Sequence, residues 1–121
     1  METGTTAIVW CAGAIAYEMA ILILNAKGGS AREFYHAVKS KLEEAGWHVE
    51  TNLRVDNRGD GRAGFVNMRA TKGGYTTGIE LDRSSARAKS VTKLQWLMQQ
   101  GEATGAVVAV RDRVHYASPT A

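Results

Sequence analysis

Residues Tyr75–Asp82, with the sequence YTTGIELD, decide the fold and carry the first sign of chemistry. Threonine and isoleucine favour a β-strand, and a pair of glycines precedes the segment. Side chains alternate along a strand, so Glu80 and Asp82 share one face while Ile79 and Leu81 share the other. A carboxylate in so apolar a setting must be exposed at the end of the sheet, paired, or bound to a cation. The stretch therefore predicts a strand that aims two carboxylates in one direction.

Two more strands are expected immediately before this one. Apolar and polar residues alternate from Trp47 to Val55, and the turn-forming residues Asp56–Arg62 follow. A second strand is expected within Ala63–Thr71, and the short Lys72–Gly74 connection then leads into Tyr75–Asp82. The pattern predicts three consecutive antiparallel strands.

A helix is expected on each side of this meander. The sequence SARE at residues 30–33 has the form of a capping box, and apolar residues then recur at helical spacing up to Gly46. After the meander, Ser84 or Ser85 is suited to cap a second helix that ends before Gly101. The two helices would cover the faces of the sheet.

The last expected element is a strand at Gly105–Val110, a continuous apolar run rich in β-branched residues. Such a run suits a strand buried on both faces, and pairing in parallel through the helix crossover is expected. The predicted fold class is α/β, of the α+β kind: a helix, a three-stranded antiparallel meander, a helix and a strand. The strands would form a mixed sheet flanked by helices.

Residues 1–29 are expected to form an apolar N-terminal extension of uncertain role, ahead of an α/β domain at residues 30–121. Glu18 interrupts the apolar run at a depth where a carboxylate in a bilayer is costly, so we expect no membrane association. The alternatives are an upstream extension before Met19, or a strand or helix added to the core or to a dimer. Ala20–Leu24 by itself reads as a short strand.

Composition limits the remaining possibilities. A chain of 121 residues has room for one compact domain, and a net charge of +3 does not by itself establish a polyanion partner. Cys11 is the single cysteine, so no internal disulfide is possible and a cytoplasmic location is expected. The three histidines lack the spacing of metal ligands, and we assign them no role.

Basic residues follow the acidic strand directly and extend along the start of the second helix. Cations there would hold backbone phosphates electrostatically. The alternative interpretation is a solvated helix face that pairs with Asp82 and Glu102. The basic residues concerned are Arg83, Arg87, Lys89 and Lys93.

The element order and the acidic strand together resemble the PD-(D/E)XK superfamily of restriction-endonuclease-like nucleases. The resemblance covers roughly Ser30–Arg113. It implies a metal-dependent endonuclease, a deoxyribonuclease that hydrolyses phosphodiester bonds with Mg²⁺ or Mn²⁺ as cofactor. The implied partner is double-stranded or branched DNA, and a small domain that acts on duplex DNA often works as a homodimer.

Four residues of this sequence fall at active-site positions of that superfamily. Glu80 matches the strand acid, Asn67 stands where the preceding strand normally carries aspartate, and Asp82 stands where lysine is usual. The resemblance implies that these three residues ligate the metal, although asparagine contributes a carbonyl oxygen without negative charge. Glu33 matches the catalytic glutamate of the first helix, but a capping box also explains a glutamate there.

The missing strand lysine has two candidate replacements on the following helix, Lys89 and Lys93. Either ammonium group would steady an attacking water or the developing phosphate charge. Asn67 and Asp82 also leave open a second interpretation, a nuclease-fold protein that has lost cleavage and binds nucleic acid or a protein partner. The sequence does not distinguish a natural Asn67 from an engineered one.

Overall fold

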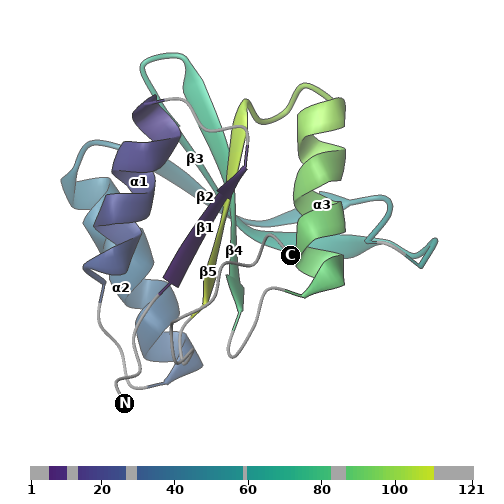
Figure 1. The fold of residues 1–121 in the computed structure, drawn as a ribbon, viewed down its shortest axis with the longest axis horizontal. Helices are drawn as coiled ribbons and strands as arrows, with labels where there is room; N and C mark the ends of the chain where they lie inside the picture. Colours follow the sequence, from purple (N-terminus) through teal and green to yellow (C-terminus); the bar gives the residue numbers. More distant parts are fainter. Residues whose placement is uncertain (1–5, 11–13, 27–29, 59, 83–86, 111–121) are drawn as a thin grey trace.

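The computed structural model describes residues 6–10, 14–26, 30–58, 60–82 and 87–110. In these residues a mixed sheet lies between helices, with α1 and α2 on one face and α3 on the other (Figure 1). The predicted α+β class, with helices flanking a mixed sheet, is confirmed. The elements are β1 (Thr6–Trp10), α1 (Ala14–Leu24), α2 (Ala31–Glu44), β2 (His48–Val55), β3 (Gly64–Lys72), β4 (Tyr75–Asp82), α3 (Ala88–Gln99) and β5 (Gly105–Val110).

The sheet has five strands in the order β1-β5-β4-β3-β2. β2, β3 and β4 form the predicted antiparallel meander, and β4 occupies the predicted range Tyr75–Asp82. β5 pairs in parallel with β4, and every residue of Gly105–Val110 is buried. The parallel pairing through a helix crossover is therefore confirmed.

The N-terminal segment contributes a strand and a helix to this fold. β1 pairs antiparallel with β5 at one edge of the sheet. The prediction of a strand at Ala20–Leu24 is wrong, because these residues complete α1. Met19 and Ile23 lie one turn apart on that helix, and both are fully buried against the α2 side of the sheet. No helix in the described part of the chain is long and apolar enough to cross a membrane.

Two hydrophobic cores lie on opposite faces of the sheet. The first core, under α1 and α2, includes Met19, Ile23, Phe34, Val38, Leu42, Met68, Ile79 and Val107. The second core, under α3, includes Val55, Val66, Leu94, Leu97, Ala106, Val108 and Val110.

Gly78 allows α3 to lie close against β4. A Cβ atom at this position would lie 2.9 Å from Cδ2 of Leu94 and 3.2 Å from Cδ1 of Leu97. The glycine therefore faces α3, and so do Glu80 and Asp82, which follow it at two-residue spacing on β4. The close packing brings the side chains of α3 directly over both carboxylates.

Along the β2–β3 hairpin, the side chains that enter the first core give way to side chains that enter the second core, on the opposite face of the sheet. Met68 belongs to the first core, whereas Val66, only two residues away on β3, belongs to the second. Asn52 on β2 has a φ of +55°, the only positive φ of a non-glycine residue in the described part of the chain. The β3–β4 ladder ends at the Met68 and Ile79 pair. β3 therefore separates from β4 at Asn67, and the end of β4 is left to be completed by side chains.

Candidate functional site

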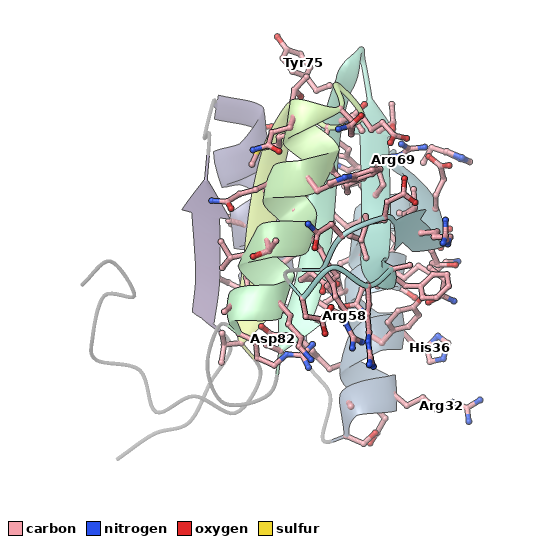
Figure 2. The ribbon with its side chains drawn as sticks, turned by 90° about the vertical axis from the view of Figure 1, so that its right-hand side faces the viewer. Arg32, His36, Arg58, Arg69, Tyr75 and Asp82 are labelled. Atoms are coloured by element: carbon pink, nitrogen blue, oxygen red, sulfur yellow. The ribbon has the colours of Figure 1, made fainter. Side chains whose placement is uncertain are left out.

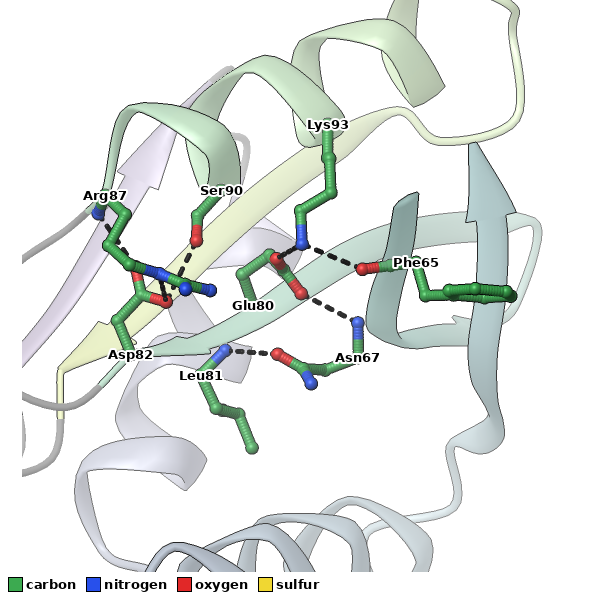
Figure 3. A network of polar contacts seen from close by, with 8 residues as sticks. All are labelled: Phe65, Asn67, Glu80, Leu81, Asp82, Arg87, Ser90 and Lys93. Carbon is green, nitrogen blue, oxygen red and sulfur yellow. Dashed lines mark hydrogen bonds and ion pairs between the residues drawn. The ribbon is translucent and has the colours of Figure 1, made fainter. Parts of the chain in front are cut away.

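Glu80 and Asp82 point from β4 towards α3, as alternation along the strand predicts (Figure 3). Only 1% of the Glu80 side chain and none of the Asp82 side chain is exposed to solvent. Buried carboxylates need charged or hydrogen-bonding partners. Both oxygens of Asp82 accept hydrogen bonds from the protein, whereas Glu80 accepts one hydrogen bond at Oε2 and has an ion pair with Lys93 at Oε1, where no hydrogen bond from a described residue is found.

Glu80 forms a buried ion pair with Lys93 of α3. Oε1 of Glu80 contacts the Lys93 ammonium group, and Oε2 accepts the backbone N–H of Asn67 at 2.7 Å. Nζ of Lys93 also donates to the carbonyl oxygen of Phe65 at 2.8 Å. Burial raises the pKa of Glu80, although Lys93 and the Asn67 N–H both act to lower it. The Glu80–Lys93 pair therefore connects α3 to β4 and, through Phe65 and Asn67, to β3.

Asn67 joins β3 to β4 where their ladder has ended. Its Oδ1 accepts the backbone N–H of Leu81 at 2.8 Å, and its own N–H binds Glu80. The side chain of Asn67 thus replaces a backbone carbonyl of β3 as the partner of β4. Asn67, which the sequence analysis assigned to a metal, has a structural role in holding the strands together.

Asp82 lies at the N-terminal end of α3. Its carboxylate accepts the backbone N–H of Arg87 at 2.9 Å, Nε of Arg87 at 3.2 Å and Oγ of Ser90 at 2.9 Å. A negative charge here interacts favourably with the helix dipole. Ser84 and Ser85, the predicted caps, lie outside the described residues, and the helix begins at Ala88 with Arg87 as its N-cap.

A pocket of about 460 Å³ opens beside this network, between the start of α2 and the separating ends of β3 and β4. Arg32 is exposed at the pocket and has no ion-pair partner among the described residues. The side chain of Tyr35 is half-buried, and its ring packs edge-on against His36 at 5.5 Å between centroids. The lining residues are Ala31, Arg32, Phe34, Tyr35, Asn67, Leu81 and Asp82.

Two of the predicted site residues that the structure describes, Glu33 and Lys89, are not part of the network. Glu33 is exposed in the first turn of α2, where its backbone N–H donates to Oγ of Ser30 at 3.1 Å. This bond caps the helix through the backbone of residue 33, and the glutamate side chain lies in the first turn, where its charge interacts favourably with the helix dipole. Lys89 is exposed on α3, where its charge acts on Asp60. The pKa of Asp60 is lowered chiefly by its hydrogen bond with Arg58 and also by the charge of Lys89. Arg83 lies outside the described residues.

Arg32 and Tyr35 line the pocket but were not predicted as site residues. Their spacing of three on α2 places them on one helix face, which was visible in the sequence. The facing wall of the pocket, at Asn67 and Leu81, depends on how β3 leaves β4 and was not visible. Arg58 was also overlooked: a Cβ atom at Gly64 would lie 3.0 Å from Cβ of Arg58 and 3.3 Å from Cδ of Lys93, so the arginine lies next to the buried lysine.

The oxygen atoms predicted to bind metal are already engaged by protein groups. The carboxylate of Glu80 contacts Lys93 and the Asn67 N–H. The carboxylate of Asp82 accepts from Arg87 and Ser90. Oδ1 of Asn67 accepts the Leu81 N–H. The described residues include no group of three or more His, Cys, Asp or Glu side chains suited to a metal ion. A divalent cation needs several free oxygen ligands. As arranged, the three residues do not fit Mg²⁺ or Mn²⁺, and the cofactor stays a prediction.

Comparisons of this chain with protein-family models, with curated proteins and with solved structures found no match.

Proposed function

We propose that this chain is a restriction-endonuclease-like domain that binds nucleic acid, DNA in the first instance, without metal-dependent cleavage. The observation that carries the proposal is that every carboxylate oxygen of Glu80 and Asp82 contacts either the Lys93 ammonium group or a hydrogen-bond donor of the protein. A cation, Lys93, neutralises the deeper carboxylate. The acids therefore pair with groups of β3 and α3 rather than present a charge to a metal.

Cations around the pocket support the choice of nucleic acid as partner. Arg32 lies in the same lower half of the molecule as Asp82 in Figure 2, as does Arg58, which is paired with Asp60, whereas Tyr75 lies at the opposite end. Arg87 is 61% exposed despite its ion pair with Asp82, and Lys89 is exposed on the same helix. Exposed basic side chains can bind the phosphate backbone, and counterion release makes such binding salt-dependent.

Binding is tested by fluorescence anisotropy with labelled DNA at about 50 and about 200 mM salt, in the absence of divalent metal. The variant Arg32→Ala with Lys89→Ala should bind several-fold more weakly and with a salt slope reduced by about one for each lost phosphate contact. Lys41→Ala is the matched control, because Lys41 is exposed in the last turn of α2, away from the pocket. Absence of DNA binding at low salt, or equal losses in the control, would refute the proposal.

A metal-dependent DNA endonuclease is the second candidate. It is favoured by one observation: Asn67, Glu80, Asp82 and Lys93, which the superfamily resemblance selects from distant parts of the sequence, belong to neighbouring hydrogen-bond groups at the end of β4. Under this candidate the missing charge at position 67 limits metal affinity.

Nicking of supercoiled DNA with Mg²⁺ or Mn²⁺ separates the two candidates. We expect no nicking by the unsubstituted chain. Nicking that is lost in Glu80→Gln would establish the endonuclease and refute our first proposal. Nicking by Asn67→Asp alone would show that only the charge at this position separates binding from cleavage. The stoichiometry of the same DNA titrations tests whether two copies bind together, since the homodimer stays a prediction.

A further inference from the structure

The pocket beside Asn67 has the dimensions and the lining of a site for one small polar ligand. Its volume of about 460 Å³ lies within the range of about 300–1,000 Å³ that is usual for small-molecule sites. A double helix is too wide to enter a cavity of this size. A single nucleotide, separated from its neighbours in the strand, would fit.

Charge on the pocket lining favours an anionic group. Asp82 is the acidic residue of the lining, and Arg87 offsets its charge through two hydrogen bonds. Arg32 has no such partner among the described residues, so its guanidinium is free to bind an anion. A guanidinium matches the geometry of a phosphate group, which it can hold through two parallel hydrogen bonds.

The remaining lining suits a nucleobase. Tyr35 offers a half-buried aromatic ring one helical turn from Arg32, and Leu81 adds a half-buried apolar side chain from β4. Because Oδ1 of Asn67 accepts the Leu81 N–H, the Nδ2 group is the part of the amide left to donate, and no described residue accepts from it. Aromatic stacking binds any base, while an amide donor selects an edge that carries an acceptor.

We infer that the pocket holds a single unpaired nucleotide of a nucleic-acid strand, with the phosphate at Arg32 and the base between Tyr35 and the Asn67 amide. This inference rests on the proposed nucleic-acid binding and specifies its substrate class. Strand ends, overhangs and bulges supply such a nucleotide, and an intact blunt duplex does not. Asn67 then has two functions, since one end of its amide joins the strands and the other faces the ligand.

The test compares three labelled DNAs of one sequence by anisotropy in the presence of EDTA: a single strand, a blunt duplex, and the duplex with one bulged nucleotide. We expect the full chain to bind the bulged duplex about tenfold more tightly than the blunt one. Tyr35→Ala should abolish this difference, and Tyr35→Phe should retain it. Phe65→Ala is the matched control, because Phe65 is 57% exposed and lies outside the pocket lining.

Each outcome decides a separate point. Equal affinity for bulged and blunt duplex would refute the nucleotide pocket but leave DNA binding intact, whereas no binding to any of the three would refute the proposed function. Should Tyr35→Ala fail to fold, as judged by circular dichroism, the exposed Arg32→Ala variant carries the test, with the same loss of preference expected. Competition by a free deoxynucleoside monophosphate as strong as that by the single strand would overturn the strand assignment in favour of a free nucleotide.

Discussion

Two glutamate–cation pairs in this protein have the same chemistry and opposite titration behaviour. Glu80 is buried beneath α3 with Lys93, and burial raises its pKa. Glu50 lies on the surface of β2, where two hydrogen bonds from Arg69, each of 3.0 Å, lower its pKa. The Glu50–Arg69 pair is partly exposed, at 40% and 20% of the side chains, and keeps part of its hydration, while the Glu80–Lys93 pair has lost it. Access to water, rather than the partner itself, decides which protonation state the fold favours.

The difference predicts unequal costs for breaking the two pairs. Lys93→Met leaves the Glu80 carboxylate buried without a cation, and we expect the free energy of unfolding to fall by about 3–5 kcal/mol. The corresponding Arg69→Met change should cost about 1 kcal/mol or less, because water can solvate Glu50. Urea unfolding, followed by tryptophan fluorescence, measures both. Equal losses would mean that burial does not distinguish the pairs.

Replacing both members of the buried pair separates the cost of burying charge from the loss of packing. The double variant Glu80→Leu with Lys93→Met should be as stable as the natural chain, or more stable by about 1–4 kcal/mol, because it removes two desolvated charges together. The same urea titration gives the result. A double variant no more stable than Lys93→Met would assign the loss to packing instead.

Asp82 is expected to contribute less than the Lys93 pairing does. Asp82→Ala removes the acceptor of the Arg87 N–H at the start of α3, a change that costs about 0.5–2 kcal/mol at helix N-termini. Asp82→Asn keeps an oxygen acceptor and should cost less. Glu44→Ala is the exposed control, because Glu44 has no ion-pair partner among the described residues, and its expected change lies within about 0.5 kcal/mol. If Asp82→Asn is as unstable as Asp82→Ala, the charge and not the hydrogen bond is what matters.

The smallest effects are those of pH. The pKa of Glu50 is lowered from its ordinary 4.5, so its pair contributes stability above that value and loses it as pH falls through the folded-state pKa. The pKa of Glu80 is raised from 4.5, so its contribution is most favourable below 4.5 and declines as pH rises through the folded-state pKa. Carboxyl ¹³C NMR titration should find one midpoint on each side of 4.5. Two midpoints on the same side would contradict the comparison.

Local patterns were sufficient for most of the elements from α2 to β5. Strand alternation placed Glu80 and Asp82 on one face because side-chain direction depends only on position along the strand. The SARE sequence located the start of α2 because a capping hydrogen bond spans only three residues. Both features depend on residues that are close in sequence, so the sequence pattern was sufficient to predict them.

Ala20–Leu24 shows where local pattern was insufficient. A short apolar run suits a buried strand and a buried helix equally well. The decision depended on Met19 and Ile23 packing into the first core together with Phe34 and Val38, a contact between distant segments. Burial of one helix face thereby outweighed the local preference for a strand.

By itself, the sequence determined that two carboxylates would share a face of β4 and that a basic helix would follow. Only the tertiary structure decided what those groups do. The close approach of α3 over Gly78 buried Glu80 against Lys93. The backbone irregularity at Asn52 and the separation of β3 from β4 at Asn67 opened the pocket at Arg32. The physical reason is that charge pairing and desolvation depend on distances in space, which alternation along one strand does not specify.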